Sequence, residues 1–215
     1  MKRNLLTMLV SLLLFTLSSC IISLRELADY DTITTDNKLT GSWLQSGKTL
    51  VVQKLEESSY KDIFAEARRS KSPFLYNDSI YATKMYIISF KENEIDYTWT
   101  ASLVNIGANT FVSLGADGAK FFDKDVSPST SLQGYSFARL EWQTANTLKL
   151  SFIDGEFVKE MVLADKARIG HEYDPLYGTF LITASADEMR SFLEKYGNDE
   201  RLFKGGRTVN LVRKN

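Results

Sequence analysis

Residues 85–114 carry the clearest alternation of apolar and polar positions in the chain. Three alternating runs are joined by short polar links, 91–93 and 105–109, and the second link contains Gly107 between two asparagines. Successive side chains of a strand point to opposite faces, so this pattern is typical of strands with one buried face and one wet face. The segment predicts an antiparallel meander of three strands, which needs a cover over its aromatic face.

Weaker alternation on both sides of the meander extends the same kind of structure. Residues 48–55, 135–144, 147–153 and 208–213 each favour a strand, and the second and third form a hairpin through Ala145-Asn146. The rest of the sheet is therefore expected from segments far apart in the sequence.

Two short helices are expected in the C-terminal third. One begins at Asp154-Gly155, and the other begins at Ser185, which forms a capping box with Glu188. The second helix carries an apolar stripe with helical spacing, and Gly197 is expected to end it in a left-handed conformation. The stripe consists of Met189, Phe192, Leu193 and Tyr196.

A Gly-x-Trp motif at Gly41 and Trp43 opens the β-rich part of the chain. It resembles the opening motif of lipocalin-like barrels. The resemblance implies that Trp43 plugs the closed end and that an arginine of the last strand packs over it, with Arg213 as first candidate and Arg207 as second. Such a contact contributes about 1–2 kcal/mol when partly desolvated. The alternative is a plain buried tryptophan at a strand start.

Together these patterns predict a mainly β fold. We expect an antiparallel lipocalin-like barrel or a strongly curved meander sheet, with one or two short C-terminal helices. Residues 39–215 are expected to form this single domain.

The N-terminus has the features of an export signal. Two basic residues precede the apolar run 5–17, which as a helix would be about 20 Å long and too short for a hydrocarbon core of about 30 Å. The following Leu-Ser-Ser-Cys resembles the lipobox of bacterial lipoprotein precursors. That resemblance implies removal of residues 1–19, acylation of Cys20 with fatty acyl chains such as palmitate, and a tether over 20–38. An ordinary signal peptide with a chance cysteine is the alternative.

Charge and cysteine content narrow the setting further. Removing residues 1–19 takes away two of the 26 basic residues and none of the 27 acidic ones, which leaves a net charge near −3. We therefore expect no nucleic-acid partner. The single cysteine excludes an intrachain disulfide and a cysteine-rich zinc site. Ile21 and not Asp follows the cysteine, and by resemblance to known lipoprotein sorting rules this favours the outer membrane. No acidic run follows the cysteine, so we expect the protein to face the periplasm, with the cell surface as the alternative.

The order of elements also resembles a family of uncharacterised bacterial proteins, many of them lipoproteins. The matching segments are 97–114, 137–154 and 182–203. The resemblance implies a β-barrel or half-barrel carrying helices. It brings no activity, and no site residues carry over from it.

Candidate chemistry is sparse. His171 is the only histidine and stands near Glu172 and Asp174, but a metal site would need further ligands. Residues 68–71 favour a solvated loop over an anion site, and residues 116–134 lack the ligand pattern of a calcium loop. No nucleophile elbow or phosphate loop is present in the sequence. We therefore expect no enzyme activity, metal or cofactor.

The aromatic residues of the predicted strands suggest a binding site instead. If they converge inside one barrel, they would line a cavity for a small apolar ligand; the alternative is that they only fill the core. An envelope scaffold acting through a protein-binding surface is the second functional hypothesis, and a hydrolase using His171 is the third. The candidate cavity residues are Tyr86, Phe90, Tyr97, Trp99, Trp142 and Phe152.

Overall fold

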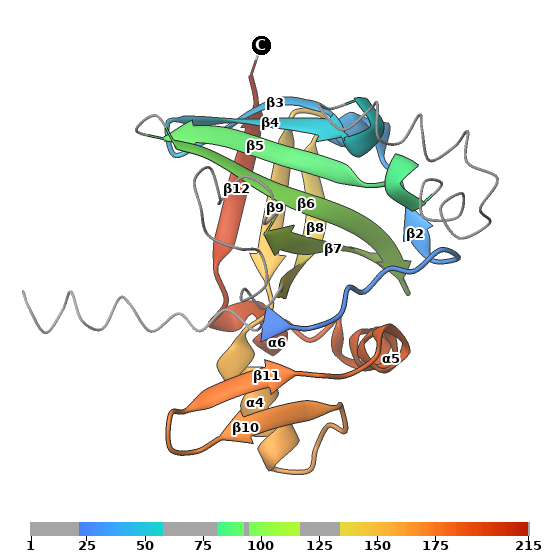
Figure 1. Ribbon diagram of the computed structural model, residues 1–215, viewed down its shortest axis with the longest axis vertical. Coiled ribbons are helices and arrows are strands. Elements are labelled where there is room, and N and C mark those ends of the chain that lie inside the picture. The colour runs from blue at the N-terminus through green and yellow to red at the C-terminus, as the bar shows by residue number, and fades with distance from the viewer. Residues whose placement is uncertain (1–21, 58–80, 93–94, 117–133, 215) are drawn as a thin grey trace, which may run out of the picture.

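The computed structural model describes residues 22–57, 81–92, 95–116 and 134–214 (Figure 1). Strands dominate this part of the chain, and the helices are short. The strands are β1 (Ile22–Ser23), β2 (Ile33–Thr34), β3 (Gly41–Gln45), β4 (Lys48–Lys54), β5 (Tyr86–Glu92), β6 (Ile95–Ile106), β7 (Asn109–Ala116), β8 (Tyr135–Thr144), β9 (Thr147–Phe152), β10 (His171–Asp174), β11 (Thr179–Ile182) and β12 (Thr208–Arg213). The helices are α4 (Gly155–Leu163), α5 (Ala186–Tyr196) and α6 (Arg201–Lys204), with 3-10 turns η1 (Asn37–Leu39) and η2 (Leu55–Glu57).

Eight of these strands close into an antiparallel barrel. β3 to β9 pair in chain order, and β12 closes the ring by pairing with β9 on one side and β3 on the other. Closure leaves no free edge in the ring. The predicted mainly β, lipocalin-like barrel is confirmed.

The predicted meander forms the centre of the barrel wall. β5, β6 and β7 pair in register, with Ile88 opposite Trp99 and Leu103 opposite Val112. Gly107 takes a φ of 58° in the turn between β6 and β7, a conformation that glycine adopts without strain. Alternate residues of these strands, such as Ala101 and Leu103, are buried inside the barrel.

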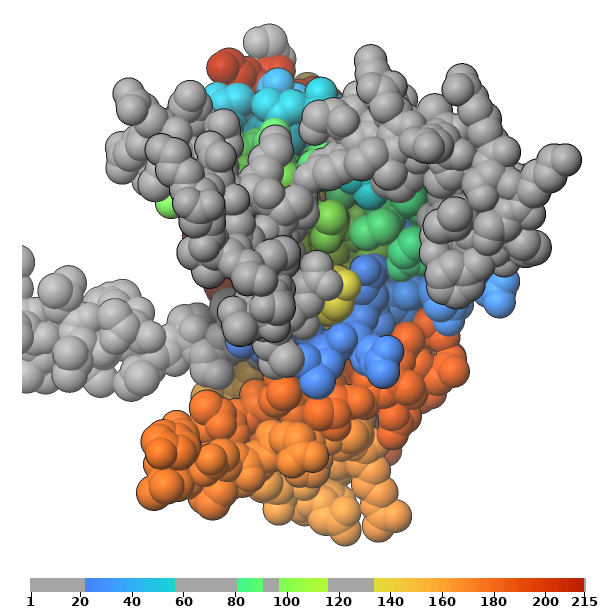
Figure 2. Space-filling model, viewed as in Figure 1, coloured from blue at the N-terminus to red at the C-terminus, as the bar shows by residue number. Residues whose placement is uncertain are grey.

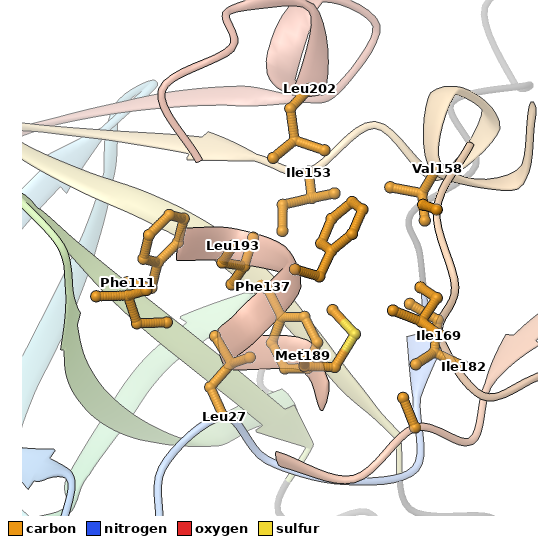
Figure 3. Close-up of a cluster of buried hydrophobic side chains, with 14 of the residues drawn as sticks. Leu27, Phe111, Phe137, Ile153, Val158, Ile169, Ile182, Met189, Leu193 and Leu202 are labelled. Carbon is orange, nitrogen blue, oxygen red and sulfur yellow. The ribbon is translucent and has the colours of Figure 1, made fainter. Parts of the chain in front are cut away.

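A second core lies outside the barrel, between its wall and the helices (Figure 3). Phe111 of β7 and Phe137 of β8 point outward from the wall and are fully buried there. Met189 and Leu193 of α5 and Val158 of α4 pack against them, together with β11. The two predicted helices are confirmed, and their apolar stripes supply the cover for this face.

The ends of α5 show one prediction confirmed and one wrong. The capping box is present, since Ser185 accepts from the Glu188 N–H and the Glu188 carboxylate accepts from the Ser185 N–H. Gly197, however, is right-handed with a φ of −65°. A Cβ there would lie 2.4 Å from the carbonyl oxygen of Leu193 and 3.0 Å from Phe111. The glycine is needed for close approach to the barrel wall and not for a left-handed turn.

Residues 22–38, predicted as part of a tether, are instead packed into the fold (Figure 2). β1 pairs antiparallel with β8 and parallel with β11, and β2 pairs with β6. Leu27 is fully buried, and its N–H donates to the Ser113 hydroxyl of β7 at 3.0 Å. The folded unit therefore includes Ile22 and does not begin at residue 39. Residues 22–38 show no clear hydrophobic period, so their packing could not be predicted from the sequence.

Candidate ligand cavity

The two ends of the barrel differ, and the Gly-x-Trp motif closes one of them. Trp43 is fully buried, and its indole N–H donates to the Leu39 carbonyl of η1 at 2.8 Å. The Arg213 guanidinium lies 4.4 Å from the centre of the Trp43 ring. Arg213 also donates to the backbone carbonyls of Thr40 (3.1 Å) and Lys38. The last strand is thereby fastened to the first strand of the barrel.

Gly41 makes this arrangement possible. Its φ is 129°, and a Cβ there would come within 2.8 Å of the Arg213 Nη1 atom. A side chain at this position would both strain the backbone and displace the guanidinium. The spacing of Gly41 and Trp43 thus has a direct geometric reason.

Asp36 completes the closed end by satisfying two aromatic polar groups. The Tyr86 hydroxyl donates to the Asp36 carbonyl at 3.0 Å and accepts from its N–H at 2.7 Å. The Trp142 indole N–H donates to the Asp36 carboxylate at 2.9 Å, and the Trp142 ring lies 5.8 Å from that of Trp43. Burial raises the pKa of Tyr86. Two of the six predicted cavity residues, Tyr86 and Trp142, therefore belong to the plug.

The opposite end of the barrel holds a cavity of about 450 Å³. Every strand of the barrel contributes to its lining, which is mostly apolar. This volume falls within the range of about 300–1,000 Å³ of small-molecule sites. The lining residues are Ile22, Gln45, Leu50, Val52, Ile88, Trp99, Leu114, Gly134, Ser136, Leu150, Phe152, Arg207, Val209 and Leu211.

The other four predicted residues lie in or beside this cavity. Trp99 and Phe152 contribute to its lining. Phe90 stacks on Trp99 with ring centres 5.0 Å apart, and Tyr97 stacks on Phe90 at 4.7 Å. These rings continue the aromatic wall toward the end of β5.

Arg207 is the charged residue among the described lining of the cavity. It is exposed, stands just before β12, and makes no ion pair with any described residue. Its backbone carbonyl accepts from the Phe152 N–H at 2.9 Å, which fixes its position at the end of the barrel. Arg207 therefore lies at the cavity and not over Trp43, where it was the second candidate.

Sequence reasoning missed most of the aliphatic lining. Ile22 and Arg207 carry no motif, and they reach the cavity because β1 pairs with β8 and β12 starts at the open end of the barrel. The alternation of β12 was the one signal pointing to Val209 and Leu211.

His171 lies away from the cavity, in β10. Its Nδ1 atom is 3.0 Å from the Ile169 carbonyl oxygen, and its ring stacks against Phe180 at 5.5 Å. In the described ranges, no three His, Cys, Asp or Glu side chains group closely enough to hold a metal ion. Residues 68–71, most of 116–134 and Cys20 lie outside the described residues.

A separate polar cluster joins residues 22–34 to the outside of the barrel. The Glu26 carboxylate accepts from the hydroxyls of Tyr81 and Ser102, both at 2.8 Å. Burial, followed by the negative charge of Glu26, raises the pKa of Tyr135 to about 12. The same causes raise the pKa of Tyr81 further. With its hydroxyls bonded internally, this cluster is structural.

No helix in the part of the chain that the structure describes has the length and apolar character needed to cross a membrane. Comparison of the chain with protein-family models, with curated proteins and with solved structures gives no match.

Proposed function

We propose that this protein is a membrane-anchored lipoprotein that binds a small apolar ligand inside its β-barrel. The observation that carries the proposal is the cavity of about 450 Å³ in the open half of the barrel. Leucine, valine, isoleucine and aromatic side chains dominate its lining, so transfer of an apolar molecule from water into it is favourable.

The polar groups of the cavity suggest how such a ligand is oriented. Gln45, Ser136 and Arg207 are the polar side chains among its described lining residues. Gln45 ends β3 and Arg207 precedes β12, whereas Leu150 and Leu211 lie within their strands and are apolar. A ligand with an apolar body and one polar end fits this distribution.

The anchor in this proposal is Cys20, two residues before β1. Its lipobox context supports cleavage before the cysteine and acylation, which holds a protein on a membrane firmly when more than one chain is attached. We place the protein at the outer membrane, facing the periplasm. Mass spectrometry of the protein extracted from its membrane tests the acylation directly.

A pair of adjacent substitutions in β12 tests the binding site. Val209→Trp puts an indole into the cavity, whereas the matched control Asn210→Trp puts the same ring on an exposed outer position. The probe is 1-N-phenylnaphthylamine, whose fluorescence rises in apolar surroundings.

Val209→Trp should weaken saturable binding of the probe at least about tenfold, a loss of about 1.4 kcal/mol. Asn210→Trp should bind like the unmodified protein. Absence of saturable binding, or equal affinity in the two variants, would contradict a ligand site inside the barrel.

A further inference from the structure

The turn between β10 and β11 presents two large apolar side chains to solvent. Leu176 is 81% exposed and Tyr177 is 78% exposed, the highest values among the large hydrophobic residues that the structure describes. Large apolar side chains exposed together mark contact surfaces more often than single ones do. Neither residue belongs to the cavity or to the two cores.

This turn is held in a defined shape. The Asp174 carboxylate accepts from the N–H groups of Leu176 (2.8 Å) and Tyr177 (3.3 Å), and Gly178 takes a φ of 66°. Pro175 fixes its own φ as well. Because the backbone is already ordered, the two side chains stay at the tip, and little conformational entropy is lost when something covers them.

β10, β11 and β1 form a small outer sheet beside the barrel. The turn lies at the end of this outer sheet where the chain enters β1 (Figure 1). β1 and β11 are parallel, with Ile22 opposite Leu181. Leu181 is four residues after Tyr177, so the start of β1 is about 13 Å along the strand direction from the tip. Ile22 is itself 47% exposed and also contributes to the cavity.

We propose that the tip formed by Leu176 and Tyr177 is a second membrane contact, which inserts into the bilayer surface beside acylated Cys20 and turns the open end of the barrel toward the lipid. The proposal rests on the lipid anchor of the proposed function. An anchor alone leaves a protein free to tilt, whereas an anchor and an apolar tip on the same side define which end faces the membrane.

A membrane is the expected partner of the tip because acylated Cys20 lies just before β1. Only Ile21 separates Ile22 from Cys20, so the acyl chains bring this end of the molecule to the membrane surface. A leucine and a tyrosine at such a tip suit the interface, where the tyrosine ring is buried and its hydroxyl stays wet. Glu172 and Asp174 are also exposed on β10. Apolar insertion, and not attraction to anionic lipid, is therefore the expected driving force.

Site-specific labelling of the acylated mature protein tests this orientation. Leu176→Cys, labelled with the environment-sensitive fluorophore NBD, is compared with Asn37→Cys, an exposed position of η1 at the closed end of the barrel. Both are reconstituted in phosphatidylcholine vesicles that contain nitroxide-labelled lipid. Acylation blocks the native thiol, so only the introduced cysteine reacts.

The label at position 176 should shift to the blue and be quenched severalfold more by the nitroxide lipid than the label at position 37. Adding phosphatidylglycerol or salt should leave this difference unchanged. Equal, weak quenching at both positions would overturn the membrane contact and leave the tip to a protein partner.

Failure of the anchor is recognised separately, because unmodified protein would then take up the label at Cys20. Failure of the ligand site is recognised by the naphthylamine probe, which does not depend on the vesicles.

Discussion

The two ends of the barrel both carry aromatic residues, but they differ in how completely these side chains are packed and hydrogen-bonded. At the closed end, Trp43, Tyr86 and Trp142 are packed together, and each of their polar atoms has a backbone or Asp36 partner. At the open end, Trp99 and Phe152 border a cavity of about 450 Å³. Aromatic content alone therefore does not distinguish a plug from a binding site.

The difference lies in the polar partners that reach each end. η1 brings Asp36 and the Leu39 carbonyl over the closed end, and β12 brings Arg213. At the open end, the exposed Arg207 makes no ion pair with a described residue. We infer that the closed end stabilises the barrel, and that the open end has a cavity and a charged side chain with which a ligand can interact.

Substitution of one tryptophan from each end, Trp43 and Trp99, should separate these roles most strongly. Trp43→Ala loses a fully buried ring, its hydrogen bond and the guanidinium contact, so the free energy of unfolding should fall by about 3–5 kcal/mol. Trp99→Ala should cost about 1–2 kcal/mol, because the ring already borders empty space. Urea denaturation measures both. Equal losses would mean that the two ends contribute alike.

The next comparison is between Arg213, which ends β12, and Arg207, which stands just before it. Arg213→Ala should lower the free energy of unfolding by about 1.5–3 kcal/mol, since a charged donor to two carbonyls is lost along with the contact to Trp43. Arg207→Ala should change it by less than about 0.5 kcal/mol. Combining Arg213→Ala with Trp43→Ala in a double-mutant cycle measures their coupling, and strict additivity would argue against the contact.

Alkaline pH should weaken the closed end gradually. The pKa of Tyr86 is raised by burial, so its contribution is fully present below the unfolded value of about 10 and is lost as pH rises through the folded value. A single group changes the free energy of unfolding by at most about 1.4 kcal/mol per pH unit.

Denaturation at several pH values from about 9 to 11 checks this expectation for Tyr86→Phe. The variant should show a shallower decline, with part of the slope remaining from Tyr81 and Tyr135, whose pKa values are also raised. Phe90→Leu at the open end removes no ionisable group and serves as the control. An unchanged slope in Tyr86→Phe would show that this hydroxyl does not contribute.

The barrel was predictable because its signal is local. Alternation over 85–114 identifies strands and their inward faces, and the Gly-x-Trp spacing points to the closed end. The same alternation does not give the height of a residue along the barrel axis. Tyr86 and Trp142 were grouped with Trp99 for this reason, although they face the same interior at its other end.

The outer sheet could not be predicted in the same way. β1 and β2 are two residues long, and β1 exists only because β8 and β11 flank it. Segments this short show no hydrophobic period, and the partners of β1 lie more than a hundred residues away in the sequence. The exposed tip at Leu176 depends in turn on the β10–β11 hairpin, which His171–Asp174 gave no sign of forming.

Closure of the ring by its last strand has a consequence for how the chain folds. Arg213 bonds to a carbonyl 173 residues earlier in the sequence. Until β12 is in place, β3 and β9 present unpaired backbone edges, which are templates for association between chains. Pairing over such a separation is slow. While the chain folds, association through the edges of β3 and β9 is therefore a risk until β12 pairs with both.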